Sequence, residues 1–314
     1  MNLPLIDDFL LYLKTNNYSL ETVYNYERDL LTFSKFLEEL SLPFEKINKG
    51  IVAQYKAYLA SKDRRTAIKD QIHENLASYS LNRMLSALRS YLKYLIDMDQ
   101  PVPVPPEAIK LVKTEKKHPK VAEFEDLVRL IESPTALEKD YLVGLRNRTI
   151  MEVLFSTGLR ISELCRLNRA DIDRSGRIFV MGKGKKERFV YLTPRAQNML
   201  ERYLSTRTDG AKALFIPYGG PNAKSSSKRI SANYIQMKIK EYREKLGINV
   251  PTSAHSLRHG FATYLAESGA SPVAIQILLG HESLDTTTRY VHASDKFAEE
   301  THRKFHPLAR LKET

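Results

Sequence analysis

Hydrophobic residues in the first 100 positions recur every three or four residues, the period of an α-helix with one buried face. The clearest stripe consists of Leu81, Met84, Leu85, Leu88, Leu92 and Leu95. Similar stripes predict helices over residues 5–13, 19–40 and 51–59. No segment of this part alternates between apolar and polar residues as a half-buried strand would. The pattern therefore predicts a small all-helical bundle.

The pattern changes beyond residue 120, where short β-rich runs lie among helical stretches. Residues 124–131 and 141–155 have helical period, and Gly158 stands where a helix C-cap is expected. Two runs rich in β-branched and aromatic residues, 177–181 and 188–192, flank a turn of glycines and lysines. We therefore predict a mostly α-helical chain with one small antiparallel β-hairpin, in which an α+β domain follows the helical bundle.

A proline-rich stretch divides the two parts. Residues 101–106 hold four prolines, which remove backbone N–H donors and fix φ, so neither a helix nor an inner strand is expected to cross them. A lysine-rich segment follows. We predict a first domain over residues 1–100, a linker over 101–118 and a second domain over 119–314.

The net charge of the chain indicates the class of its binding partner. The chain has 314 residues and a formal net charge of +12. Residues 1–100 carry 13 basic and 13 acidic side chains, so the whole excess belongs to residues 101–314. A strongly basic balance is typical of proteins that bind polyanions, and nucleic acid is the first candidate.

Other features exclude several classes of protein. No apolar run reaches the roughly 18 residues that a membrane-spanning helix needs. The N-terminus carries acidic residues where a signal peptide has Lys or Arg. Cys165 is the only cysteine, which excludes an internal disulfide framework and a Cys-rich zinc site. We expect a soluble, cytoplasmic protein without a membrane partner.

Four short stretches carry residues suited to binding a phosphate group. They are residues 157–164, 182–188, 255–263 and 278–290. Each has an ordinary structural explanation when taken alone, such as a surface ion pair between Arg160 and Glu163 or a solvated lysine turn. On a helix, His255 and Arg258 lie three residues apart on one face, so both can point at one group.

A metal site is not predicted. His255 and His259 have the four-residue spacing of two zinc ligands on a metalloprotease helix. Position 256 is Ser, however, where that motif has its catalytic Glu, and no cysteine cluster offers further ligands. Nothing else in the chain suggests a cofactor.

The order of the four stretches is more specific than any one of them. An Arg, a Lys on a hairpin, a His-x-x-Arg, a Leu-Gly-His and a Tyr nine residues later follow one another. In this the chain resembles the tyrosine recombinase (phage integrase) family, and within it the Xer-type recombinases, over essentially its whole length. The resemblance implies a helical, SAM-like core-binding domain that clamps DNA, followed by the α+β catalytic domain.

The resemblance also implies the catalytic residues, which are Arg160, Lys183, His255, Arg258, His281 and Tyr290. Tyr290 attacks a backbone phosphodiester, which leaves a 3′-phosphotyrosine and a free 5′-hydroxyl, while Lys183 protonates the departing oxygen. The two arginines and His281 meet the phosphate charge. His255 either does the same or takes the tyrosine proton, and Glu163 orients the cations. Neither ATP nor a metal is needed.

Further cations are expected to contact DNA without taking part in the reaction. In the second domain they are Lys185, Lys186, Arg188, Lys228 and Arg229, and in the first domain Arg64, Arg65 and Arg83. The first domain is neutral overall, so a DNA clamp requires its cations to gather on one face.

The implied function is site-specific recombination through a Holliday junction, with Xer-like resolution of chromosome or plasmid dimers, and hence chromosome partition at cell division. The implied partners are a double-stranded DNA site and further protomers, in a homo-tetramer or in a hetero-tetramer with a paralogue, on two duplexes. A division-linked activator is left open. The alternatives are the integrase of a mobile element, a type IB topoisomerase-like enzyme and a catalytically silent DNA-binding relative.

The C-terminal residues predict one more helix. Ser294 is a suitable N-cap, Phe297, Thr301 and Phe305 follow at four-residue steps, and Pro307 ends the pattern. A helix this short needs a groove to bury its apolar face. The resemblance favours exchange of this helix with a neighbouring protomer, and packing on its own domain is the alternative.

Overall fold

The computed structural model divides the chain into two compact units, residues 1–117 and 118–314, and each is described by itself. The residues that the structure describes are 3–61, 76–114, 122–181, 187–224, 228–280, 299–300 and 302–310. No helix among them is long and apolar enough to span a bilayer.

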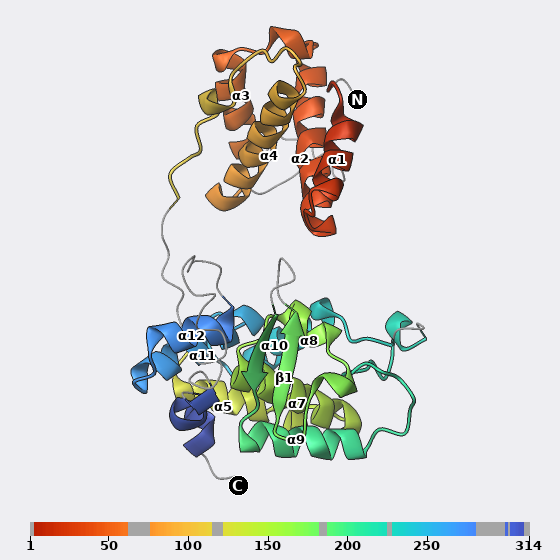
Figure 1. Cartoon of the computed structure of the whole chain (residues 1–314), viewed down its shortest axis with the longest axis vertical. Helices are drawn as coiled ribbons and strands as arrows, with labels where there is room; N and C mark the ends of the chain where they lie inside the picture. Colours follow the sequence, from red (N-terminus) through yellow and green to blue (C-terminus); the bar gives the residue numbers. More distant parts are fainter. Residues whose placement is uncertain are drawn as a thin grey trace. The chain divides into compact units, whose positions relative to one another are not determined.

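The first unit is the predicted helical bundle. Its helices are α1 (Ile6–Thr15), α2 (Leu20–Glu39), α3 (Lys49–Ala60) and α4 (Ser78–Asp97) (Figure 1). The side chains of Ser19 and Asn48 accept backbone N–H bonds at the starts of α2 and α3, which explains why these helices begin there. Aromatic rings fill the core, with Phe9 packed edge-on against Tyr91. The helical fold predicted from the apolar stripes is confirmed.

The proline-rich stretch differs from the predicted linker. Val104 and Ile109 are buried in the core of the first unit. The Asn82 side chain donates to the Val112 carbonyl (2.9 Å) and accepts from the Val112 N–H (2.8 Å). Residues 102–112 therefore complete the first unit instead of connecting two domains. The prolines keep the stretch extended, but burial of the apolar residues among and after them holds it against the first unit.

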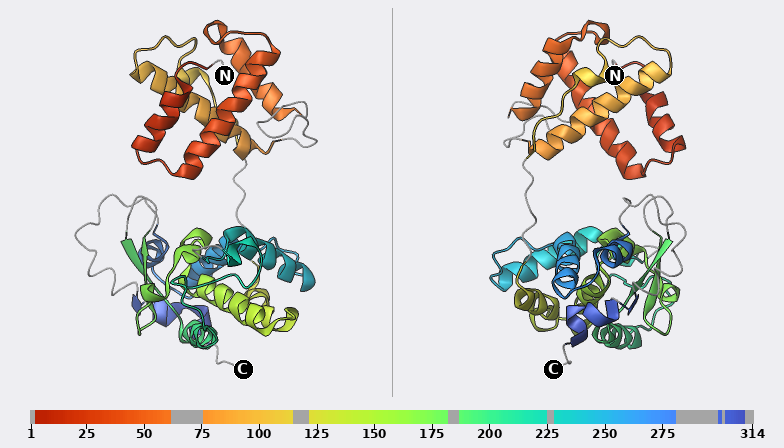
Figure 2. Two further views of the ribbon diagram at one scale, coloured as in Figure 1. Left: turned by 90° about the vertical axis from the view of Figure 1, so that its right-hand side faces the viewer. Right: turned by 60° about the vertical axis from the view of Figure 1, so that its left-hand side comes forward.

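The second unit is built around one buried helix. Its helices are α5 (Phe124–Glu132), α6 (Pro134–Leu137), α7 (Tyr141–Thr157), α8 (Ile161–Arg166), α9 (Pro194–Ser205), α10 (Ala232–Lys245), α11 (Ala254–Glu267) and α12 (Pro272–Leu279). Almost every side chain of α7 from residue 144 onward is buried, and the helix packs against α5, α6, α9 and α11 (Figures 1 and 2). This central position fixes the end of α7, from which the candidate site begins.

The predicted hairpin is present. Strands β1 (Arg177–Met181) and β2 (Glu187–Tyr191) are antiparallel, with Ile178 opposite Val190 on the buried face. Strand β2 begins one residue earlier than predicted. This small sheet beside many helices confirms the mixed class that the sequence predicts for the second unit.

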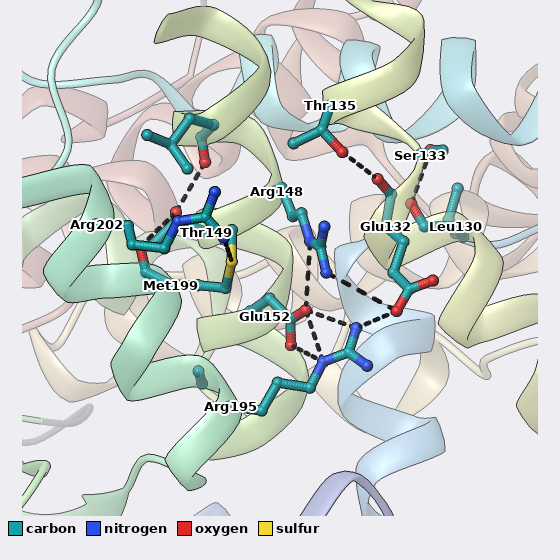
Figure 3. A network of polar contacts seen from close by, with 12 residues as sticks. Leu130, Glu132, Ser133, Thr135, Arg148, Thr149, Glu152, Arg195, Met199 and Arg202 are labelled. Atoms are coloured by element: carbon teal, nitrogen blue, oxygen red, sulfur yellow. Dashed lines mark hydrogen bonds and ion pairs between the residues drawn. The ribbon is translucent and has the colours of Figure 1, made fainter. Parts of the chain in front are cut away.

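A buried network of charges joins α5, α7 and α9 (Figure 3). Arg195 is within 2.7 Å of both Glu152 and Glu132, and Glu152 is completely buried. Arg148 approaches the same two carboxylates at 3.7–3.8 Å. Removing one partner of a buried ion pair costs about 3–5 kcal/mol in general, because the other charge is left unpaired. The network therefore holds α7 in one register against its neighbours.

The C-terminal residues pack on the second unit of the same chain. His302, His306 and Leu308 are buried, whereas Phe305 is only half-buried. Phe305, a member of the predicted stripe, packs against the cluster that includes Phe261 and Leu278, and the buried His302 and His306 are additions that the stripe omits. Residues 294–298 and 301 lie outside the described residues. Pro307 begins a 3₁₀ turn, Pro307–Arg310, instead of ending the segment. Exchange between protomers stays a prediction.

The two histidines cap the end of α7. His302 donates from Nε2 to the Ser156 carbonyl, and His306 donates from Nε2 to the Phe155 carbonyl at 3.1 Å. The His306 Nδ1 accepts the Leu308 N–H, so this ring must be neutral. Burial lowers the pKa of His302 to about 4 and that of His306 well below its usual value.

We expect acidification from pH 7.5 to 5.5 to release the C-terminal segment. A free histidine titrates near 6.5, so the released segment binds more protons than the docked one at pH 5.5. Docking is most stable well above pH 6.5 and weakens as the pH falls toward the docked pKa, by roughly 1 kcal/mol for His302 at pH 5.5. Hydrogen exchange of residues 302–308 measures this.

The matched control is His302→Gln, whose side-chain amide reaches about as far as the histidine Nε2 and can donate to the Ser156 carbonyl without titrating. This variant is expected to show a smaller change in protection between the two pH values. Equal protection of the wild-type segment at pH 7.5 and 5.5, after correction for the intrinsic exchange rate, would contradict the expectation.

Candidate active site

The turn that leaves α7 positions the first arginine. Gly158 caps the helix with φ of 63°, and a Cβ there would lie 2.6 Å from Cδ1 of Phe261. Only glycine combines this backbone conformation with so close an approach. The turn brings α7 against α11 and makes Arg160 the N-cap residue of α8.

Glu163 is the buried carboxylate of the site. Its Oε2 accepts from the Arg160 backbone N–H (2.8 Å) and its Oε1 from the Arg160 guanidinium (3.0 Å). Arg188 donates to both oxygens, at 3.0 and 2.8 Å. Burial alone would raise the pKa of Glu163, but hydrogen bonds from Arg188 and Arg160 lower it below its usual value. The carboxylate is therefore ionised and holds two guanidinium groups in place.

Arg258 joins the end of α7 to the end of α12. Its Nη1 donates to the Gly158 carbonyl and its Nη2 to the Leu279 carbonyl, each at 2.6 Å. Burial, Arg160 and Arg188 lower the pKa of Arg258 to about 10, so the side chain keeps its charge at neutral pH. A guanidinium has five N–H donors. Three of them remain for another acceptor.

His255 lies one turn before Arg258 on α11. Its Nε2 is 2.9 Å from Nε2 of His259, so one ring donates and the other accepts. Burial lowers the pKa of His255, and the charges of His259, Arg258 and Arg160 lower it further. A neutral imidazole can accept a proton, which favours the general-base alternative over the phosphate donor.

The site carries more positive than negative charge. Arg160, Arg188 and Arg258 surround the carboxylate of Glu163, and repulsion among neighbouring cations adds to burial in lowering the pKa values of His255 and Arg258. An anion with several oxygens would relieve that repulsion and satisfy the remaining N–H donors. In the described part of the chain, no three His, Cys, Asp or Glu side chains are close enough to share a metal ion. The geometry thus suits a phosphate group.

Two predicted DNA contacts have other partners. Arg188 is buried against Glu163 and so differs from the exposed phosphate ligand that its place beside the hairpin turn suggested. Arg229 donates to the carbonyls of residues 165–167 and to the Asn168 side chain, which caps the end of α8. Both arginines were taken for DNA contacts because sequence shows charge but not the buried acceptors that the fold supplies.

The other predicted DNA contacts and site residues fall into two groups, those that the structure describes and those outside the described residues. Arg83 is half-exposed and pairs with the buried Asp29 at 2.5 Å, while Lys228 is exposed. Several predicted residues lie outside the described residues: Lys183, Lys185, Lys186, His281, Tyr290, Arg64 and Arg65. Among the described residues, β2 begins at Glu187, directly after residues 182–186, and α12 ends at Leu279, two residues before His281.

Sequence reasoning missed two kinds of contributor. His259 was considered only as a metal ligand, yet it hydrogen-bonds the candidate base His255. The carbonyls of Gly158 and Leu279 hold Arg258, and backbone acceptors leave no mark in a sequence. The four-residue spacing of the two histidines was the one available signal.

Comparison with known proteins gives concordant results for both units. Residues 121–296 match the phage integrase family, and residues 6–98 match the phage integrase N-terminal SAM-like domain. The chain is 33% identical to the tyrosine recombinase XerC of Halalkalibacterium halodurans, over 97% of each chain. It is 35% identical to that of Pelobacter propionicus, covering 97% of this chain and 96% of the relative.

Solved structures share the fold. XerH bound to a palindromic difH substrate, in a post-cleavage complex, is 22% identical with a TM-score of 0.67, over 92% of this chain and 81% of that one. A lambda integrase tetramer bound to a Holliday junction is 17% identical with a TM-score of 0.68, over 90% of this chain and 77% of that one. At these identities the likeness concerns the fold alone.

Proposed function

The chain belongs to the phage integrase family, and from that premise we propose that it cuts and rejoins DNA as a Xer-like site-specific recombinase, through a 3′-phosphotyrosine. The observation that supports this most is the convergence of Arg160, Arg258 and a neutral His255 on one positively charged site. Relatives named tyrosine recombinase XerC, similar over nearly the whole chain, agree with that chemistry.

In the proposed cleavage step, the phenolic oxygen of Tyr290 attacks the scissile phosphorus, and the bond from phosphorus to the 5′-oxygen breaks. His255 takes the phenol proton, and Lys183 gives a proton to the departing 5′-oxygen, so charge balances. Arg160 and Arg258 donate to the nonbridging oxygens, where negative charge builds up in the transition state.

Rejoining is the same step in reverse. The 5′-hydroxyl of the partner strand attacks the phosphotyrosine, and the tyrosine leaves with a proton returned by the imidazole. His281 adds a hydrogen bond to the phosphate in both directions. The phosphodiester energy is kept in the covalent intermediate, so the proposed reaction needs neither a nucleotide nor a metal ion.

The proposed partners are double-stranded DNA and further recombinase protomers. Neighbours of the same fold are described as a dimer bound to a core site and as a tetramer on a Holliday junction. We extend this to a homo-tetramer, or a hetero-tetramer with a paralogue, on two duplexes. The role in dimer resolution, chromosome partition and cell division, and any division-linked activator, belong to the same proposal. A mobile-element integrase would use the same chemistry.

The function is tested by trapping the covalent intermediate. Wild-type protein is incubated with fragmented genomic DNA, denatured in SDS and recovered, and the attached DNA is sequenced. The expected result is protein joined to 3′ ends at one recurring sequence. Scattered ends, together with relaxation of a supercoiled plasmid that lacks the site, would favour a topoisomerase. Absence of any covalent DNA would leave a silent DNA-binding protein.

A further inference from the structure

Arg188 connects three parts of the site. It is on β2, two residues past the hairpin turn that carries Lys183, and its side chain is only 8% exposed. We propose that Arg188 is a positioning residue that fixes α8, β2 and the end of α12 relative to one another, and that it is not a phosphate contact. This inference rests on the proposed recombinase function.

The first connection runs to α8. Two guanidinium nitrogens, Nη1 and Nη2, meet the two oxygens of Glu163 at 3.0 and 2.8 Å in a bidentate pair. The same carboxylate accepts the backbone N–H and the guanidinium of Arg160. Arg188 therefore fixes the orientation of Glu163, and through it the orientation of the catalytic arginine.

The second connection runs to α12. The third nitrogen, Nε, donates to the Leu278 carbonyl at 3.1 Å. The last four carbonyls of a helix have no partner within it, and this bond satisfies one of them. Arg258 donates to the next carbonyl, that of Leu279. Two guanidinium groups thus hold the helix end that precedes His281.

Gly280 makes this close approach possible. It caps α12 with φ of 63°, and a Cβ at this position would lie 2.9 Å from Cδ of Arg188. Any other residue would push the Arg188 side chain away from the helix end. The glycine before His281 is therefore explained by the arginine that packs against it.

Only arginine can make this set of contacts. Its planar fork presents Nε, Nη1 and Nη2 in fixed directions, whereas a lysine ammonium is a single point with a flexible stem. All three nitrogens of Arg188 already donate to acceptors in its own unit. Two N–H donors remain on the guanidinium, but the side chain is only 8% exposed, which limits its access to a DNA phosphate.

The test uses Arg188→Lys, which keeps the charge but loses the fork. We expect cleavage at saturating DNA to slow by about a hundredfold, the loss that a displacement of about 1 Å in a reacting group can cause. DNA affinity and its salt dependence are expected to stay as in the wild type. If Arg188 instead contacted a phosphate, Arg188→Gln would lower the slope of log K against log salt by about 0.9.

Lys139→Gln is the matched control, because this exposed cation lies in the same unit and is not among the predicted site or DNA-contact residues. It is expected to cleave bound DNA at the wild-type rate. A second variant, the double substitution Arg188→Gln with Glu163→Gln, removes both partners of the buried ion pair. We expect this variant to melt near the wild-type temperature. Cleavage is still expected to be slow, because the hydrogen bond to the Leu278 carbonyl and the ion pair with Glu163 are both lost.

The outcomes separate this inference from the proposed function. If wild-type protein forms no covalent adduct, the proposed function fails. If the wild type is active and Arg188→Lys cleaves as fast, the positioning role alone is refuted. A lower salt slope for Arg188→Gln with normal cleavage of bound DNA would also overturn it. So would recovery of both melting temperature and cleavage rate in the double variant.

Discussion

Tyr290→Phe is expected to bind the DNA site with near-normal affinity and to form no covalent adduct. The substitution removes one oxygen, the proposed nucleophile, and phenylalanine has no atom that can attack phosphorus. Binding energy comes from cations and backbone contacts elsewhere, so affinity is expected to change little. The SDS-resistant protein–DNA band measures the adduct, and a mobility-shift titration measures affinity.

Tyr141→Phe provides a matched control, because Tyr141 is an exposed tyrosine of the same unit at the start of α7. It is expected to form adduct at the wild-type rate. An SDS-resistant band from Tyr290→Phe equal to that of the wild type would show that another residue is the nucleophile.

Arg258→Met is expected to slow cleavage of bound DNA by at least about 10³-fold. Loss of one donor that stabilises a transition-state oxyanion typically costs about 10²–10³-fold, and Arg258 also ties the ends of α7 and α12 together. Arg258→Lys keeps the charge but not the planar fork, so an intermediate loss is expected. Single-turnover cleavage at saturating DNA separates this effect from binding.

The control for Arg258 is Arg129→Met. Arg129 makes an exposed ion pair with Asp126 on α5, and its loss is expected to leave the cleavage rate unchanged. Thermal melting of each variant shows whether the carbonyls of Gly158 and Leu279 can tolerate the missing donor. Normal cleavage by a folded Arg258→Met protein would remove this arginine from the mechanism.

Local patterns predicted much of the fold. The stripe from Leu81 to Leu95 is the buried face of α4, and the β-rich runs form the hairpin. These elements follow from the periods of the helix and the strand, which depend only on neighbours in the sequence. The order of the motifs likewise identified Arg160, His255 and Arg258, which the structure brings together.

Contacts between distant residues could not be predicted in the same way. The prolines around Val104 and Ile109 predict a linker, because their effect on the backbone can be read from neighbouring residues. The core that Val104 and Ile109 join is formed by residues far away in the sequence, which no local pattern reveals. The sequence predicts a DNA contact at Arg188, because its charge is a local feature whereas its buried partner Glu163 is 25 positions away. The predicted apolar stripe of the C-terminal segment contains only Phe297, Thr301 and Phe305, whereas His302 is also buried there because its ring bonds a backbone carbonyl of α7.

Most of the acceptors that frame this site are backbone carbonyls, those of Phe155, Ser156, Gly158, Leu278 and Leu279. Every amino acid supplies the same carbonyl, so a change of side chain at an acceptor position does not by itself remove the contact. Substitutions therefore remove these hydrogen bonds mainly when they replace the arginine or histidine donors. Among related chains, we expect the arginine and histidine donors to be conserved while the side chains at the acceptor positions vary independently. Methods that infer contacts from paired substitutions would therefore miss these side chain–backbone hydrogen bonds.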